Sequence, residues 1–241
     1  MQLAGHCGDE ADLLATGRSD WYRSVVAAAE KLRGEVDRLF VAGLSMGALL
    51  ALKLAADRPD MVDGLGLYGT TFAYDGWTIP WIGKLSFLLP LVTSLGFGRN
   101  QKFHECFPYG IKDERIRQRI AGSMLSGDSA AAGLPGNPWP SLAEFYRLSW
   151  RVRRLLPNVR TPTLVVHAKD DDVASLKNVR TVVRGVGGPV ETVLLENSYH
   201  MITVDQERDI VIERTTRFFN EVAATRFVTM PERRPAVAVA D

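Results

Sequence analysis

The sequence predicts an α/β protein in which helices cover both faces of a mostly parallel β-sheet. Two observations predict it. Short, continuous apolar runs alternate with helical segments at both ends of the chain, and strands buried on both faces have this uninterrupted apolar character. The 241 residues, 46% of them hydrophobic and 24% charged, are also typical of one globular domain with a substantial core.

The first block predicts two strands, each preceded by a helix. Apolar side chains share one face of the first helix, and Gly34 follows its last residue. Pro59 ends the second helix, which is rich in alanine and leucine. The expected elements are a helix over residues 19–33, a strand over 39–42, a helix over 48–57 and a strand over 65–68.

The second block returns to the same alternation. Its expected elements are a strand over residues 163–167, a helix over 176–184, a strand over 192–195 and a long helix over 205–222. The last residues, 225–241, contain two prolines and little periodicity and predict a flexible tail. We therefore expect a core made of residues 1–69 and 157–224, interrupted by an insertion over residues 70–156.

The insertion contains the most apolar stretch of the chain, residues 77–97. Helical pieces are expected near residues 113–125 and 141–156. A helix that spans a membrane needs about 20 apolar residues in a row, and prolines, glycines and Lys84 interrupt this stretch. We therefore expect no membrane span, but a cap over the core with a buried or lipid-facing apolar element.

Charge and cysteine content exclude several classes of protein. Lys and Arg number 29 and Asp and Glu 28, which gives a net charge of +1, whereas a nucleic-acid partner would require a clustered basic face. Cys7 and Cys106 are the only cysteines, which predicts free thiols in a reducing compartment. The first ten residues lack the basic and apolar regions of a signal peptide. These features predict a cytoplasmic protein.

A nucleophile motif lies between the first expected strand and the helix that follows it. Residues 43–47 read Gly-Leu-Ser-Met-Gly and match the G-x-S-x-G nucleophile elbow. The sharp turn would strain the backbone of Ser45, and we expect Gly43 and Gly47 both to be needed because a Cβ atom there would clash. The Ser45 hydroxyl would then stand above the sheet, and the Met46 N–H would bind an oxyanion.

Four histidines could supply the general base that a serine hydroxyl requires. His200 follows a strand and precedes the last helix, at the edge of the sheet where such folds bind ligands, and is the predicted base. His167 lies inside an apolar strand and predicts a packed residue. We expect His104 to be a surface histidine of the insertion, and His6 to have a structural role in its glycine-rich loop.

Three adjacent carboxylates follow the strand over residues 163–167. Such a run is usually a solvated turn, so we expect two of Asp170, Asp171 and Asp172 to be solvated and one to orient the His200 ring. The chain order Ser45, Asp171, His200 is the Ser, Asp, His order of the α/β hydrolases. The spacing from His167 to Asp171 does not match a metal motif.

Three segments resemble the bacterial carboxylesterase and monoacylglycerol lipase branch of the α/β hydrolases. They are residues 41–47, 161–171 and 198–205. The resemblance implies the α/β-hydrolase fold, an inserted helical cap that lines the acyl pocket, and a triad acid at Asp171. The family has a glycine where this chain has Ala168, so Asp170 and Asp172 stay open as alternatives.

One motif of that family has no counterpart here. Ahead of the loop that residues 3–6 resemble, the family carries a strand that ends in His-Gly, followed by an apolar residue whose N–H is the second oxyanion donor. We expect either a truncated or mis-started reading of a longer enzyme, which the retained triad favours, or a protein that has lost catalysis.

These residues predict a serine hydrolase of short- or medium-chain carboxylic esters or monoacylglycerol. Ser45 would be the nucleophile, His200 the base, Asp171 the orienting acid and Met46 the oxyanion donor, with no metal or cofactor. The expected ligand is a small acyl ester, with lipid-surface contact through the cap. The alternatives are a non-catalytic protein that binds an apolar ligand or partner, and a hydrolase of thioesters, lactones or carbon–carbon bonds.

Overall fold

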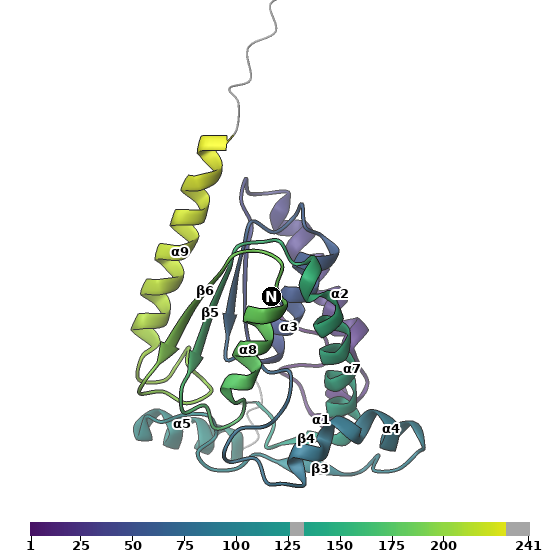
Figure 1. Ribbon diagram of the computed structural model, residues 1–241. Helices are drawn as coiled ribbons and strands as arrows, with labels where there is room; N and C mark the ends of the chain where they lie inside the picture. Colours follow the sequence, from purple (N-terminus) through teal and green to yellow (C-terminus); the bar gives the residue numbers. More distant parts are fainter. Residues whose placement is uncertain (126–132, 230–241) are drawn as a thin grey trace, which may run out of the picture.

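A four-stranded parallel sheet forms the centre of the molecule. The computed structural model describes residues 1–125 and 133–229 (Figure 1). The sheet has the strand order β1-β2-β5-β6, and every neighbouring pair is parallel. Its strands are β1 (Phe40–Leu44), β2 (Gly64–Tyr68), β5 (Thr163–Ala168) and β6 (Val190–Leu195). The predicted fold class is confirmed.

The register brings the carboxyl ends of the strands together at one edge of the sheet. Leu44 of β1 pairs with Tyr68 of β2, and Tyr68 pairs with Val166 of β5. The ladder continues one residue further, because the Ser45 N–H donates to the Tyr68 carbonyl at 2.8 Å. The loops that follow the strands therefore meet at this edge.

Helices bury both faces of the sheet. On one face lie α2 (Arg18–Arg33), α3 (Met46–Asp57), α7 (Trp139–Leu155) and α8 (Leu176–Gly185), and on the other lies α9 (Arg208–Thr229). Successive residues of β5 serve opposite faces, since Val165 packs in the first core and Leu164 and Val166 in the second. This alternation is why the strand is apolar throughout.

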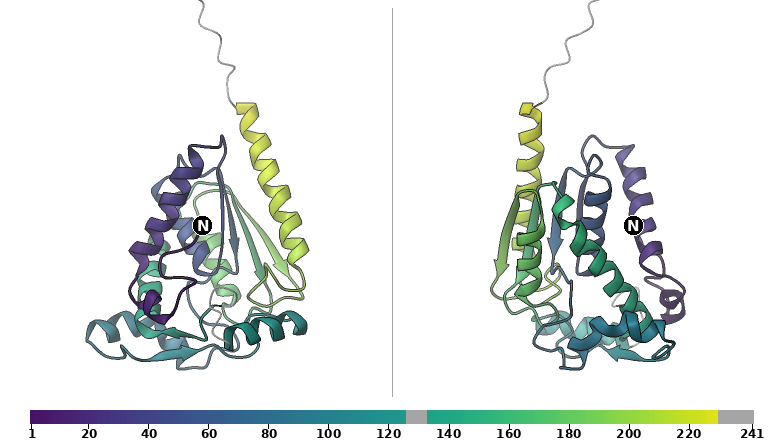
Figure 2. Two further views of the ribbon diagram at one scale, coloured as in Figure 1. Left: turned by 180° about the vertical axis from the view of Figure 1, so that it is seen from behind. Right: turned by 45° about the vertical axis from the view of Figure 1, so that its right-hand side comes forward.

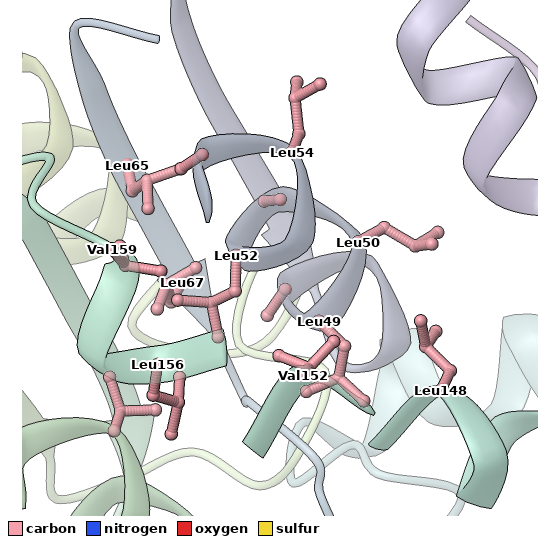
Figure 3. Close-up of a cluster of buried hydrophobic side chains, with 14 of the residues drawn as sticks. Leu49, Leu50, Leu52, Leu54, Leu65, Leu67, Leu148, Val152, Leu156 and Val159 are labelled. Atoms are coloured by element: carbon pink, nitrogen blue, oxygen red, sulfur yellow. The ribbon is translucent and has the colours of Figure 1, made fainter. Parts of the chain in front are cut away.

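Helix α3 is the centre of the larger core. It is buried along most of its length, and Figure 3 shows Leu49 and Leu52 pointing toward β2 and the carboxyl half of α7, while Leu50 and Leu54 point to other sides. Four leucines of α3 take part: Leu49, Leu50, Leu52 and Leu54. The helix that follows Ser45 is thus fixed by packing on several sides.

Helix α7 packs in this core, although its residues fall within the insertion expected over residues 70–156. Phe145, Leu148 and Val152 recur at helical spacing and pack in the same cluster as α2 and α3. The part of the insertion outside the main core is smaller. Its elements are η1 (Gly83–Leu88), α4 (Leu89–Ser94), β3 (Lys102–His104), α5 (Glu114–Leu125) and β4 (Gly136–Pro138).

These cap elements lie across the carboxyl end of the sheet (Figures 1 and 2). The apolar stretch of residues 77–97 is divided between η1 and α4, six residues each, as its prolines predict. In the part of the chain that the structure describes, no helix is long and apolar enough to cross a bilayer.

Two smaller elements are α1 (Glu10–Leu14) and η2 (Leu156–Asn158), and β3 pairs with β4 in antiparallel orientation. The last helix differs from expectation at both ends. Helix α9 begins at Arg208 rather than 205, because Asp205 accepts hydrogen bonds from other segments. It continues to Thr229, so residues 225–229 are helical, whereas residues 230–241 of the expected tail lie outside the described residues.

Candidate active site

Ser45 occupies a strained turn between β1 and α3. It is the single residue between the two elements, and its backbone angles are φ 55° and ψ −116°. A positive φ is uncommon for a residue other than glycine and is a form of backbone strain found at functional sites. The packing of α3 and the ladder bond from Ser45 to Tyr68 hold the turn in this conformation.

The two glycines of the motif are not equivalent. A Cβ atom on Gly43 would lie 2.2 Å from the carbonyl carbon of Gly47, which forbids any side chain there. A Cβ atom on Gly47 would meet no heavy atom within 4 Å. The prediction that both glycines relieve a clash was therefore wrong for Gly47, because that residue already lies in the first turn of α3 with its Cβ direction open.

The Ser45 hydroxyl donates a hydrogen bond to Thr71. The two oxygens are 3.1 Å apart, and Thr71 Oγ1 also lies 3.0 Å from the Gly69 carbonyl. A carbonyl only accepts, so the single hydrogen of Thr71 goes to Gly69 and the hydrogen between the two hydroxyls comes from Ser45. His200 is not a hydrogen-bond partner of Ser45 in this arrangement of the described residues.

His200 and Asp171 form a buried pair. The His200 Nδ1 atom is 2.9 Å from Asp171 Oδ2 and 3.1 Å from Oδ1. Because both partners are carboxylate oxygens, Nδ1 carries a hydrogen and donates it. The opposite nitrogen, Nε2, is then the one that can accept a proton when the ring is neutral.

Each member of the Asp170–Asp172 run has a different environment. Asp171 Oδ1 accepts the main-chain N–H of Val173 at 2.9 Å and of Ala174 at 2.7 Å. Asp172 is also buried and accepts the His200 N–H at 3.2 Å. Asp170 is exposed. The expectation that two of the three are solvated was wrong for Asp172, because the His200 loop covers it.

Two buried carboxylates join the His200 loop to the cap. Asp172 accepts the Gly110 N–H at 3.0 Å as well as that of His200. Asp205, which has no exposed surface, accepts the N–H groups of Lys112, Asp113 and Tyr199 at 2.8–2.9 Å. Cap residues 110–113 and the loop that carries His200 are therefore held as one unit.

The charges around His200 determine the direction in which its pKa is shifted. Burial alone would lower it, but the negative charges of Asp171, Asp172 and Glu105 together raise the pKa of His200 above its usual 6.5. Burial would raise the pKa of Asp171, and the charge and hydrogen bond of His200 outweigh that effect and lower it. For Asp172, burial is the largest effect and raises the pKa.

Ser45 and His200 open into one cavity of about 650 Å³ between the sheet edge and the cap. Its walls are mainly apolar. The apolar side chains of the insertion that line it include Ile79, Phe103, Ile111, Ile120 and Leu142. The polar pair Glu105 and Asn137 also lines it, with Asn137 Nδ2 donating to Glu105 Oε1 at 2.5 Å. Burial raises the pKa of Glu105.

The remaining predicted residues lie as follows. His6 lines the cavity, with its Nδ1 atom 3.0 Å from the Ala4 carbonyl and its ring edge-on to Trp21. His104 is an exposed residue of β3. Met46 is the first residue of α3, so the helix provides no acceptor for its N–H. No group of three metal-binding side chains occurs among the described residues.

Sequence reasoning did not find Thr71, Glu105 or the contact made by His167. His167 Nε2 lies 3.2 Å from Asp171 Oδ2. Thr71 and Glu105 carry no motif, because their roles come from loops that meet only after folding. The contact of His167 could have been expected from the sequence, because His167 lies four residues before Asp171, near the end of the same strand.

Comparison with known proteins decides the family. A family model described as serine aminopeptidase, S33, matches residues 17–207. The chain belongs to the S33 serine aminopeptidase family. The matched region of this S33 protein includes Ser45, Asp171 and His200 and ends two residues after Asp205.

Two curated relatives of the S33 protein are similar over most of its length. A thermostable monoacylglycerol lipase from Bacillus sp. (strain H-257) is 26% identical over 219 residues, which are 90% of this chain and 77% of the relative. A carboxylesterase from Bacillus subtilis (strain 168) is 24% identical over 232 residues, 92% of this chain and 80% of the relative.

Solved structures agree on the fold. A structure of the metagenome-derived lipolytic enzymes LipS and LipT has a TM-score of 0.73 and 25% identity, covering 91% of the S33 protein and 80% of that chain. A soluble variant of monoglyceride lipase from Saccharomyces cerevisiae has a TM-score of 0.71 and 16% identity, covering 95% and 77%. The S33 protein thus has the α/β-hydrolase fold.

Proposed function

We propose that this S33 family member is a serine hydrolase that cleaves carboxylic esters through an acyl-enzyme. One observation carries the proposal: a histidine whose Nδ1 is bonded to a buried carboxylate shares a cavity with a serine held at positive φ. A nucleophile, a base and an orienting acid at one site are the set that acyl transfer requires. The ester-cleaving relatives support the choice of bond.

In the first half of the reaction, the Ser45 hydroxyl turns from Thr71 toward His200 and attacks the ester carbonyl. His200 Nε2 takes the serine proton, and Asp171 stabilises the imidazolium. The N–H of Met46 binds the oxyanion of the tetrahedral intermediate, assisted by the positive end of α3. His200 then gives the proton to the leaving alcohol, and the acyl group stays on Ser45.

In the second half, water replaces the alcohol. His200 takes a proton from the water as it attacks the acyl carbon, the same N–H binds the new oxyanion, and the carboxylic acid leaves as Ser45 recovers its proton. The proposed steps use these three side chains and one main-chain N–H, and none of them uses a metal ion. We therefore expect hydrolysis to be unchanged by a metal chelator.

The cavity supports an acyl ester of short or medium chain length as substrate. About 650 Å³ of mainly apolar space can hold a chain of that size away from water. The names of the two Bacillus relatives support a monoacylglycerol or a simple carboxylic ester. We also propose a cytoplasmic location, on the ground that Cys7 and Cys106 are both free thiols.

The cap supports contact with a lipid surface. Cap residues 77–97 include many large apolar side chains that are exposed, among them Trp81 at 72%, Leu91 at 60% and Phe97 at 67%. The same segment lines the cavity through Ile79, Pro80 and Gly83. An apolar surface of this extent next to a cavity is typical of an interaction site. Aggregated molecules of an acyl-ester substrate would present a matching apolar surface to it.

The experiment that tests the function is labelling with a fluorophosphonate probe combined with hydrolysis of p-nitrophenyl butyrate. We expect wild-type protein to be labelled and to turn over, Ser45→Ala to do neither, and the control Ser94→Ala, in an exposed cap serine, to do both. Folded wild-type protein that forms no Ser45-dependent adduct contradicts the proposal. Binding of an apolar ligand without turnover would then favour the non-catalytic alternative.

A further inference from the structure

The geometry points to His167 as a positioning residue that holds the Asp171 carboxylate in place for His200. The inference rests on the proposed function, because the reaction that Asp171 would serve is itself proposed. His167 is the second-last residue of β5 and has no exposed surface. It therefore touches neither solvent nor the cavity, and any effect on the reaction passes through its neighbours.

The contacts of the His167 ring determine where its hydrogen lies. Nε2 is 2.7 Å from the Ala174 carbonyl and 3.2 Å from Asp171 Oδ2. The Ala174 carbonyl can only accept, so Nε2 carries the hydrogen and donates it to Ala174, while Asp171 Oδ2 is a close polar neighbour outside that hydrogen bond. Nδ1 is buried and has no hydrogen-bond partner among the described residues. Burial lowers the pKa of His167, which makes the ring a neutral donor with its N–H on Nε2.

The partners of Asp171 show how the His167 ring bears on its carboxylate. Oδ1 is held by the main-chain N–H groups of Val173 and Ala174. Oδ2 accepts from His200 Nδ1, and His167 Nε2 lies 3.2 Å from it with its N–H directed at the Ala174 carbonyl. His167 thus packs against the oxygen to which His200 is bonded without itself donating to it.

His167 also supports the other half of the carboxylate. The Ala174 residue whose carbonyl accepts from His167 is the one whose N–H donates to Asp171 Oδ1. The ring therefore holds Oδ1 through the turn and packs against Oδ2. A buried imidazole with an unpartnered nitrogen costs free energy, so packing alone gives no reason for a histidine where a leucine would fit the apolar strand.

Kinetics of two substitutions test the inference. We expect His167→Leu, which removes the donor, to lower kcat about 10- to 100-fold with KM little changed, as losses of supporting hydrogen bonds around an active site do. His167→Gln, whose amide N–H reaches nearly as far as Nε2, should restore most of kcat. The matched control is Thr163→Val, which removes a buried donor of the same strand, 2.8 Å from the Thr161 carbonyl, and should keep kcat.

A double-mutant cycle separates positioning from general structural damage. In a variant that already carries Asp171→Asn, adding His167→Leu should cost little more, because the carboxylate that His167 orients is gone. An equal loss of kcat in both backgrounds would mean that His167 acts independently of Asp171 and would overturn the inference. A kcat of His167→Gln as low as that of His167→Leu would overturn it too.

A measurement that needs no activity keeps this inference separate from the proposed function. In protein labelled with ¹⁵N-histidine, NMR should show His167 as the neutral Nε2–H tautomer at neutral and mildly alkaline pH, with a shift that changes in Asp171→Asn. A ring that titrates in this range, or that carries its hydrogen on Nδ1, refutes the positioning role. Wild-type protein that hydrolyses no ester but shows this spectrum refutes the function and not the contact.

Discussion

At the scale of single residues, three carboxylates surround one imidazole. Asp171 is bonded to the His200 ring and Asp172 to the His200 main chain, while Glu105 lines the same cavity. Each negative charge favours the protonated ring, and together they outweigh the effect of burial and raise the pKa of His200 above 6.5. If His200 is the base, as proposed, it is therefore protonated and inactive over a wider range of acid pH than an exposed histidine would be.

The pH dependence of hydrolysis follows from that direction. Only neutral His200 can accept the serine proton, so kcat/KM should fall on acidification, with its midpoint above pH 6.5. Glu105→Gln removes one of the negative charges, and so the midpoint should move to lower pH. The measurement is a kcat/KM profile with a neutral ester, and Glu213→Gln, in an exposed residue of α9, is the control.

Two outcomes contradict this account. A profile that is flat across the acid range would exclude His200 as the general base. A midpoint that Glu105→Gln leaves unmoved, or shifts as much as Glu213→Gln does, would mean that the Glu105 charge does not act on the ring.

Sequence alone identified candidate residues where a local pattern carries the chemistry. Ser45 was predicted because a strand–turn–helix motif surrounds it, and His200 because it follows a strand at the ligand-binding edge. The choice among Asp170, Asp171 and Asp172 needed the structure, since adjacent residues of a turn point in different directions that sequence does not record. Thr71 could not be predicted, because its contact joins loops from two different strands.

At the scale of elements, the turn between β1 and α3 depends on one glycine more than on the other. Gly43→Ala would place Cβ 2.2 Å from a main-chain atom of Gly47, and the backbone cannot yield without moving Ser45. We expect it to lower the free energy of unfolding by about 3 kcal/mol or more. Gly47→Ala meets open space in a helix and should change that free energy by about 1 kcal/mol or less.

Urea denaturation of the two variants checks this pair, with fluorophosphonate labelling as a second readout. Gly47→Ala should keep both stability and labelling, which makes it the control for Gly43→Ala. Equal stability of the two variants would show that the turn can relax around a side chain at residue 43.

Strands and helices were predictable where their apolar pattern is set by burial alone. The expected strands over residues 39–42, 65–68, 163–167 and 192–195 each overlap a strand of the sheet. Helix α7 was assigned to the insertion because its sequence follows the cap without a break. Whether an amphipathic helix packs on the cap or on α3 depends on tertiary contacts, which its own periodicity does not specify.

At the scale of the whole molecule, the cap presents an apolar face beside the cavity. Trp81, Leu91 and Phe97 are exposed on it. If this face meets lipid, replacing all three by serine should weaken binding to phosphatidylcholine vesicles at least about 100-fold, because each side chain contributes roughly 1 kcal/mol or more of transfer free energy. Hydrolysis of a monomeric, water-soluble ester should be unchanged.

The control places three serines on apolar residues that are exposed elsewhere. Leu32 lies on α2, and Ile210 and Ile212 lie on α9. Sedimentation with neutral vesicles measures binding without a contribution from lipid charge. Equal loss of binding in the two triple variants would show that the cap face has no special affinity for lipid.

The hydrogen bond from Ser45 to Thr71 has a kinetic consequence. Because Thr71 gives its own hydrogen to Gly69, the serine proton in the free protein is engaged with Thr71 and not with the imidazole. In the proposed mechanism, each turnover would then begin with a rotation of the hydroxyl. We expect Thr71→Val, which removes the competing acceptor, to accelerate the pre-steady-state burst of an activated ester. A slower burst would mean instead that the threonine helps to align the attacking oxygen.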